Sequence, residues 1–140
     1  METLVPAAPV LRELAHALVR QVPRHSISRA AAGTLGILAR EGPQRITVLA
    51  EREAVSQPAM TNLVRRLEGH GLVSRASDPA DARATLISVT PDGVATLQER
   101  RRLVDADVAT TLERLSPDDR AAIVAALPAL THFTELHESR

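Results

Sequence analysis

Apolar residues recur every three or four positions in the first part of the chain, which is the spacing of one face of a helix. One such segment covers residues 10–22, and Pro23 is expected to end it because proline cannot continue a helix. The next segment follows Ser28, a residue type that caps helix N-termini, and stops at Gly42-Pro43. The pattern therefore predicts two amphipathic helices before residue 44.

Two shorter helices are predicted to follow in close succession. The first of them begins near Thr47 and closes around Ala54-Val55. The second has Ser56 as its N-cap and Pro58 in its first turn, where the missing N–H of proline costs nothing. It ends at Gly69-His70-Gly71, so this pair predicts a helix-turn-helix.

The period then changes to that of strands. Residues 72–75 and residues 85–89 are two β-compatible runs, and the polar segment 77–81 with its proline lies between them. This arrangement predicts a β-hairpin with a long loop.

Two further helices are predicted after the hairpin. The sequence Thr90-Pro91-Asp92-Gly93 is a helix start, and the helix it opens should be roughly 23 residues long, against about 11–12 for an average helix. Ser116 begins the same signal again and opens the last helix, which Pro128 is expected to kink or break.

The order of these elements predicts a mainly helical, winged helix-turn-helix fold with a small β-hairpin as the wing. We assign residues 28–92 to the winged helix-turn-helix domain, residues 1–27 to an N-terminal dimerisation helix and residues 93–140 to C-terminal dimerisation helices. The terminal helices have apolar stripes that the small winged core cannot cover, and surplus stripes of this kind usually pack against a second copy. We therefore expect a second copy of the chain to cover these stripes.

The helix after Ser56 has two chemically distinct faces. Its apolar residues Met60, Leu63, Val64 and Leu67 lie at i, i+3, i+4 and i+7 and should face the core. The opposite side and its flanks are polar, and their side chains match the donors and acceptors of a DNA major groove: Thr61, Asn62, Arg65 and Arg66. An ordinary solvated helix surface would have a similar composition.

The predicted wing adds a second candidate contact. Arg83 lies where the hairpin turns back and could enter a minor groove beside the major-groove site. Asp81 precedes it by two residues and could brace the guanidinium group, or the two could form a surface ion pair worth about 0–1 kcal/mol.

Composition narrows the classes of function. All 17 basic residues are Arg, which suits nucleic-acid recognition but is also explained by codon bias in a GC-rich genome. The 17 basic residues balance 17 acidic ones, which excludes a polybasic coat protein. Phe133 is the single aromatic residue, so base stacking on aromatic platforms is not available. Cysteine is absent, and no apolar run approaches the length of a membrane span, so we expect a cytoplasmic protein without thiol chemistry.

The motifs of this chain resemble those of the MarR family of bacterial transcriptional regulators. The resemblance covers about residues 28–95. It rests on the following stretches: Ile46 to Arg52, Val55 to Thr61, Leu67-Glu68, Gly71 to Val73, the wing Asp78 to Arg83, and Val89 to Gly93. It implies an intertwined homodimer that binds a pseudo-palindromic operator in double-stranded DNA, usually as a repressor and often under the control of a small-molecule effector. It further implies that DNA-facing positions are those of Ser56, Gln57, Thr61, Asn62 and Arg65, with Arg83 acting from the wing.

Two positions depart from the family pattern, and one branch of the family is excluded. Ala82 stands where many relatives have a second basic residue at the wing tip. Ala54 replaces a turn glycine, which is tolerated unless this residue needs a positive φ. Peroxide sensing through cysteine is excluded.

We expect no cofactor, no metal and no catalysis. The five histidines are not spaced as the ligands of a metal site: His16, His25, His70, His132 and His137. No candidate nucleophile has a general base beside it in the sequence. The residues of an effector site cannot be assigned from the sequence. Two alternatives to a DNA-binding regulator are a winged-helix module that binds another protein and a helical dimer that binds a small molecule without DNA.

Overall fold

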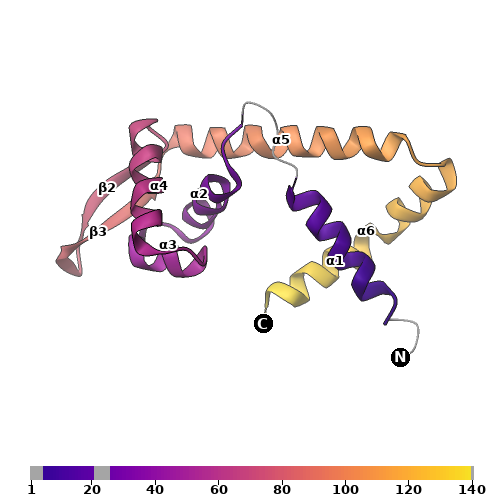
Figure 1. Cartoon of the computed structure of the whole chain (residues 1–140), viewed down its shortest axis with the longest axis horizontal. Coiled ribbons are helices and arrows are strands. Elements are labelled where there is room, and N and C mark those ends of the chain that lie inside the picture. The colour runs from indigo at the N-terminus through magenta and orange to yellow at the C-terminus, as the bar shows by residue number, and fades with distance from the viewer. Residues whose placement is uncertain (1–4, 21–25, 140) are drawn as a thin grey trace. The chain divides into compact units, whose positions relative to one another are not determined.

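The computed structural model describes residues 5–20 and 26–139, which form nine helices and strands (Figure 1). Their bounds are α1 Ala7–Arg20, α2 Arg29–Glu41, β1 Gln44–Arg45, α3 Ile46–Arg52, α4 Gln57–Gly69, β2 Val73–Asp78, β3 Asp81–Val89, α5 Pro91–Glu113 and α6 Pro117–Glu138. This order confirms the mainly helical winged helix-turn-helix fold. Pro23, expected to end the first helix, lies outside the described residues.

The chain divides into two compact units, and the division falls within α5. The first unit extends to Val104 and the second begins at Asp105. Among the described residues, the buried apolar residues of the core all belong to the first unit and come from α2, α3, α4, the connection from α4 to β2, the sheet and the first part of α5. The second unit consists of the rest of α5 and α6, and no residue of α6 is buried. The hydrophobic core therefore stabilises the winged domain, and α6 contributes no buried residue to it.

Side-chain caps begin the helices where the sequence predicts them. The Ser28 hydroxyl accepts the N–H of Ala31 at 3.1 Å, and the Ser56 hydroxyl accepts the N–H of Ala59 at 3.2 Å. Thr90 serves α5 twice, because its hydroxyl accepts the N–H of Gly93 at 3.1 Å and donates to the carbonyl of Gly71 at 2.6 Å. The second bond ties the start of α5 to the end of the helix-turn-helix.

The sheet differs from the predicted hairpin in two respects. It has three strands in the order β1-β3-β2, because Gln44 pairs with Ile87 and Arg45 with Leu86. The predicted long loop is wrong: β2 and β3 continue until Asp78 faces Asp81, with a register shift at Ser77/Asp78. The polar residues that suggested a loop are strand residues of an exposed wing, where polar side chains cost nothing.

The last helix also corrects an expectation. Pro128 lies inside α6, which runs without a break from Pro117 to Glu138. The predicted break is therefore wrong. Ser116 caps this helix by accepting the N–H of Asp119 at 3.1 Å, as the sequence indicates.

Candidate nucleic-acid interface

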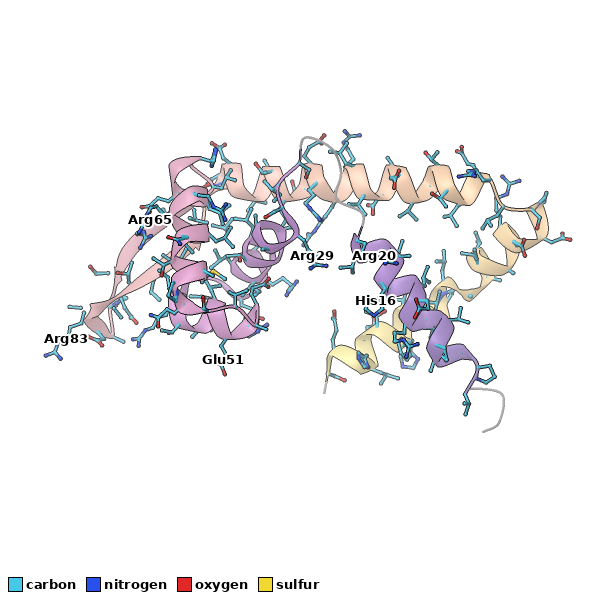
Figure 2. The ribbon with its side chains drawn as sticks, in the orientation of Figure 1. His16, Arg20, Arg29, Glu51, Arg65 and Arg83 are labelled. Carbon is cyan, nitrogen blue, oxygen red and sulfur yellow. The ribbon has the colours of Figure 1, made fainter. Side chains whose placement is uncertain are left out.

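Helix α4 separates its apolar and polar faces as a helix on the surface of a core must. Met60, Leu63, Val64 and Leu67 are buried, with Met60 and Val64 fully so. Asn62 and Arg65 are exposed, and Thr61 is half-buried at the border. Figure 2 shows Arg65 on α4 and Arg83 at the far end of the wing. The exposed face is thus available to a partner along the length of the helix.

The polar groups of this face hold one another in place. Arg65 donates from Nη1 to Oδ1 of Asn62 at 3.4 Å, one turn earlier on the helix. Thr61 donates its hydroxyl proton to the backbone carbonyl of Gln57 at 2.9 Å. An amide beside a guanidinium group offers both acceptors and donors, which is the set that base edges in the major groove complement.

The N-terminus of α4 adds backbone donors to the same face. Ser56 and Gln57 are exposed there, and Pro58 occupies the first turn. The first N–H groups of a helix have no partner within the helix and form its positive end, which attracts phosphate. The Ser56 hydroxyl satisfies one of them and keeps its own proton to donate.

Arg66 lies apart from these residues. It borders a groove formed with the start of α2 and the end of α4, whose other lining residues include Ile27, Ala31 and His70. Arg66 therefore flanks the exposed face of α4 on the side toward the start of α2.

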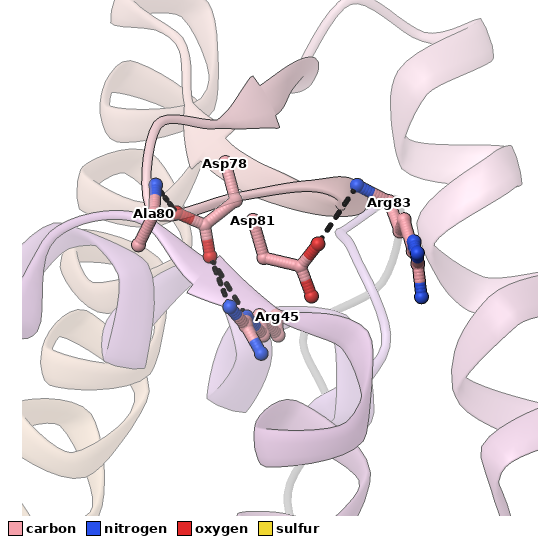
Figure 3. A network of polar contacts seen from close by, with 5 residues as sticks. All are labelled: Arg45, Asp78, Ala80, Asp81 and Arg83. Atoms are coloured by element: carbon pink, nitrogen blue, oxygen red, sulfur yellow. Dashed lines mark hydrogen bonds and ion pairs between the residues drawn. The ribbon is translucent and has the colours of Figure 1, made fainter.

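The wing turn is organised by Asp78 (Figure 3). Its Oδ2 accepts from Nε of Arg45 at 2.8 Å and from Nη2 of the same residue, and its Oδ1 accepts the N–H of Ala80 at 2.9 Å. The N–H of Ala80 and then the Arg45 guanidinium lower the pKa of the Asp78 carboxyl. One carboxylate thus connects the residue before α3 to the turn of the wing.

Asp81 acts on the backbone of Arg83. Its Oδ1 accepts the N–H of Arg83 at 3.0 Å, and Figure 3 shows this bond with no interaction drawn between the carboxylate and the guanidinium group. The ion pair considered from the sequence is not among those formed by the described residues. Asp81 fixes the local backbone and leaves the Arg83 side chain exposed.

Arg45 is a functional candidate that the sequence analysis did not identify. It lines a cavity of about 350 Å³ together with Thr47, Gln57, Arg83 and Thr85. The start of α3, the start of α4 and strand β3 meet at this cavity. Gln57 and Arg83, which are 26 positions apart, therefore belong to one concave surface. No local sequence signal marks Arg45, because its role depends on the distant Asp78.

The histidines give no sign of a metal site in the part of the chain that the structure describes. No group of three His, Cys, Asp or Glu residues there could hold an ion. The Nδ1 of His70 lies 2.7 Å from the carbonyl of Arg66, and His137 stacks on Phe133 with ring centroids 5.8 Å apart. His25 lies outside the described residues.

None of the helices that the structure describes combines the length and the apolar character that a membrane span requires.

Comparison with known proteins identifies the family. The profile of the MarR family matches residues 27–85. An uncharacterized HTH-type transcriptional regulator of Mycobacterium bovis is 34% identical over 98 residues, which are 70% of this chain and 68% of the relative. The crystal structure of the transcriptional regulator Tm0710 of Thermotoga maritima superposes with a TM-score of 0.77 at 26% identity and covers 96% of this chain and 98% of that one.

A third similar structure is that of Bordetella bronchiseptica BpsR, from work on the regulation of its DNA binding by 6-hydroxynicotinic acid. It has a TM-score of 0.56 at 25% identity and covers 90% of this chain and 98% of that one. The fold and the exposed face of α4 define a winged helix-turn-helix protein. The chain belongs to the MarR family, whose members are transcriptional regulators and not enzymes.

Proposed function

We propose that the protein is a sequence-specific DNA-binding regulator that acts as a homodimer on a pseudo-palindromic operator and represses transcription. The observation that carries this proposal is the polar face of α4, where Asn62 and Arg65 are exposed and already hydrogen-bonded to each other. In this proposal Ser56, Gln57 and Thr61 bind near the same groove, and Arg66 binds the flanking backbone.

The wing supplies the second contact of each subunit. Arg83 is exposed at the tip of the sheet and shares a concave surface with Arg45 and Gln57. Arginine is the residue type that enters narrow minor grooves because of their negative potential. We assign Arg83 to the minor groove and Asp81 to the support of its backbone. The alanine at position 82 leaves one cation at this tip.

Dimerisation is supported by the apolar surface of the terminal helices. Helices α1 and α6 have no buried residue. The large apolar side chains that they expose to solvent are Val10, Leu14, Leu18, Val19, Ile123, Val124, Leu127, Phe133 and Leu136. A second copy would cover them. We therefore propose that residues 1–27 and 93–140 form the dimer and residues 28–92 bind DNA. Two α4 helices about 34–36 Å apart would then enter successive major grooves.

An effector is supported by the similarity to BpsR, whose DNA binding is regulated by 6-hydroxynicotinic acid. A ligand that favours a dimer with a different spacing of the two α4 helices would release the operator, because both helices must engage together. No particular effector follows from this similarity.

The test is fluorescence anisotropy with DNA from upstream of the gene and an unrelated duplex of equal length, each titrated at several salt concentrations. A dimer that neutralises about 6–10 phosphates should lose about 10³–10⁵ in affinity between 50 and 200 mM salt. We expect this slope and a preference for the upstream duplex. A shallow slope with either duplex would instead favour a protein-binding module, and ligand binding without DNA binding would favour a small-molecule carrier.

The assignment of α4 is tested by the double variant Asn62→Ala, Arg65→Ala. We expect it to lose the preference for the upstream duplex and to retain weak, salt-dependent binding. The matched control is Gln98→Ala, Arg102→Ala, which removes an exposed amide and an exposed guanidinium group from α5. Unchanged specificity in the α4 variant would disprove the assignment.

A further inference from the structure

A cavity of about 400 Å³ lies in the first unit, on the side chains of α2, the end of α3 and the first part of α5. Four arginines line it, Arg40, Arg52, Arg100 and Arg101, together with the single carboxylate of Glu53. None of these residues belongs to the proposed DNA-binding surface. A cavity of this size accommodates a small ligand.

Two of the guanidinium groups converge on one point of α2. A Cβ atom built on Gly36 would lie 3.8 Å from Nη1 of Arg40 and 3.9 Å from Nη2 of Arg101. Within residues 5–20 and 26–139, neither arginine has a carboxylate oxygen within the 4.0 Å of an ion pair. Two like charges over one point repel each other, and an anion between them would remove this repulsion.

The other two arginines are already engaged. Both Nη atoms of Arg52 donate to the carboxylate of Glu41, each at 2.7 Å. Nε of Arg100 donates to the carbonyl of Ile27 at 3.3 Å, which fixes its side chain at the border of the cavity. Among the described residues, Arg40 and Arg101 are therefore the two of the four that make no side-chain hydrogen bond or ion pair, and Arg100 keeps its two Nη groups as further donors.

Glu53 lies in the same cavity, and no ion pair in the described part of the chain includes it. Its Oε2 is 2.6 Å from the position that a Cβ on Gly33 would take, so the carboxylate rests on the bare backbone of α2. Burial raises the pKa of the Glu53 carboxyl, against a smaller opposite effect of Arg52. Glycine inside a helix is destabilising, and at position 33 it leaves the space that this carboxylate occupies.

We propose that this cavity binds a small oxyanion, such as a carboxylate or phosphate group of a metabolite, between Arg40 and Arg101, and that Glu53 takes up a proton when the anion binds. The anion and the Glu53 carboxylate would share one cavity, and two negative charges at that distance favour protonation of the weaker acid. The charged groups that face Glu53 are Arg40 of α2, Arg52 of α3, and Arg100 and Arg101 of α5.

The position of Glu53 connects the cavity to DNA binding. Glu53 is the C-cap of α3, and Ser56 caps α4 three residues later. Ala54 between them has a φ of 52°, a left-handed conformation that alanine adopts at a cost. A ligand that changes the charge of Glu53 therefore acts on the turn that orients α4. This consequence rests on the proposed DNA-binding function, whereas anion binding itself does not.

Anion binding is tested with sodium sulfate, whose charge is constant between pH 5 and 8. The unfolding temperature is measured against sulfate concentration at constant ionic strength for the unmodified protein, for Arg40→Gln, Arg101→Gln and for the control Arg75→Gln. Sulfate stabilises all proteins through exclusion from their surface, and that part is common to every variant. We expect a saturable additional rise in the unmodified protein and the control that is absent from the double variant. Equal rises in all three proteins would overturn the proposal.

Proton coupling is tested with Glu53→Gln. In the unmodified protein the affinity for sulfate should increase as the pH falls through the pKa of Glu53. The variant should bind sulfate about tenfold more tightly at pH 8, because one repulsive charge is gone, and its affinity should not change with pH. The same pH dependence in both proteins would overturn the role of Glu53.

The link to DNA is tested separately by anisotropy with and without sulfate at constant ionic strength. We expect sulfate to change the DNA affinity of the unmodified protein and not that of Arg40→Gln, Arg101→Gln. Failure of DNA binding in all proteins would speak against the proposed function, whereas normal DNA binding that ignores bound sulfate would overturn the regulatory role of the cavity.

Discussion

Arg45 and Asp78 are 33 positions apart in the sequence, and Nε of Arg45 donates to Oδ2 of Asp78 at 2.8 Å. Asp78 has only 10% of its side chain exposed, whereas 42% of Arg45 is exposed. The carboxylate is thus shielded at the base of the wing turn while the guanidinium group reaches the surface. This pair fixes the wing that presents Arg83 against the start of α3.

Asp78→Asn should weaken DNA binding several-fold, although Asp78 itself is not a DNA contact. The amide loses the charge that holds Arg45, and Arg83 then samples more orientations. A double-mutant cycle with Arg45→Met measures the coupling by anisotropy. If Arg45 acts only through Asp78, the DNA affinity of the double variant equals that of the single variant with the lower affinity. Additive losses would show instead that Arg45 contacts the DNA directly.

Stability at acid pH should depend on Asp78. Its pKa is lowered from the usual 3.8, so the unfolded chain binds this proton more readily than the folded one. The stabilisation is complete well above 3.8 and is lost as the pH falls through the lower pKa of the folded state. Urea unfolding between about pH 6 and pH 2.5 should show a smaller acid-dependent loss for Asp78→Asn than for the unmodified protein. Asp105→Asn serves as the control, and an equal pH dependence for Asp78→Asn would contradict this account.

Ala54→Gly should stabilise the protein by about 1 kcal/mol, because glycine adopts a positive φ without the clash of a Cβ atom. Ala54 has a φ of 52° and is exposed, so the substitution removes no packing. The matched control is Ala59→Gly, which places the same substitution in the exposed first part of α4 and should destabilise by about 0.5–1 kcal/mol. Urea unfolding of the two variants should give shifts of opposite sign. A destabilised Ala54→Gly would show that the turn is not strained.

Gly93→Ala should destabilise the first unit by about 3 kcal/mol, as overpacking in a close contact does. A Cβ at Gly93 would lie 2.1 Å from the carbonyl oxygen of Leu72, which is backbone and cannot rotate away. Gly69→Ala is the control, because nothing lies within 4 Å of its Cβ position. Thermal unfolding should separate the two variants clearly, and equal midpoints would refute the close approach of α5 to the end of the helix-turn-helix.

Arg83→Ala should lower DNA affinity and make the slope of log affinity against log salt shallower by about 2, because each of the two subunits neutralises one phosphate fewer and each phosphate contributes about 0.9 to the slope. The effect should be similar for all flanking sequences unless the wing enters a minor groove, in which case narrow A·T flanks suffer most. Arg102→Ala, an exposed arginine of α5 that pairs with Glu99 at 2.8 Å, is the control. A salt slope that Arg83→Ala leaves unchanged would exclude Arg83 from the interface.

Local chemistry made much of this fold predictable. Ser28, Ser56 and Ser116 each precede a helix and accept a backbone N–H three residues later, as expected for serine at an N-cap. The apolar stripe of α4 and the length of α5 follow from periodicity in the same way. These signals act within one or two turns of the chain, so a single sequence contains them in full.

The features that could not be predicted depend on distant partners. Gln44-Arg45 has no strand-like pattern and becomes β1 only because β3 lies beside it. Asp78 looks like a loop residue until Arg45 and the N–H of Ala80 are in place. The cavity of Arg40 and Arg101 joins α2 to α5, and Glu53 reaches it from α3. The identities of such partners are set by tertiary packing.

Arg45 belongs to two elements at once, because it pairs with Leu86 in the sheet and is also the N-cap residue of α3. No flexible linker separates the strand from the helix. If α3 tilts, the wing has to move with it, because a separate movement of α3 would break the β1–β3 pairing. Glu53 at the end of α3 and Arg83 on the wing are therefore connected through the β1–β3 pairing and not through a loop.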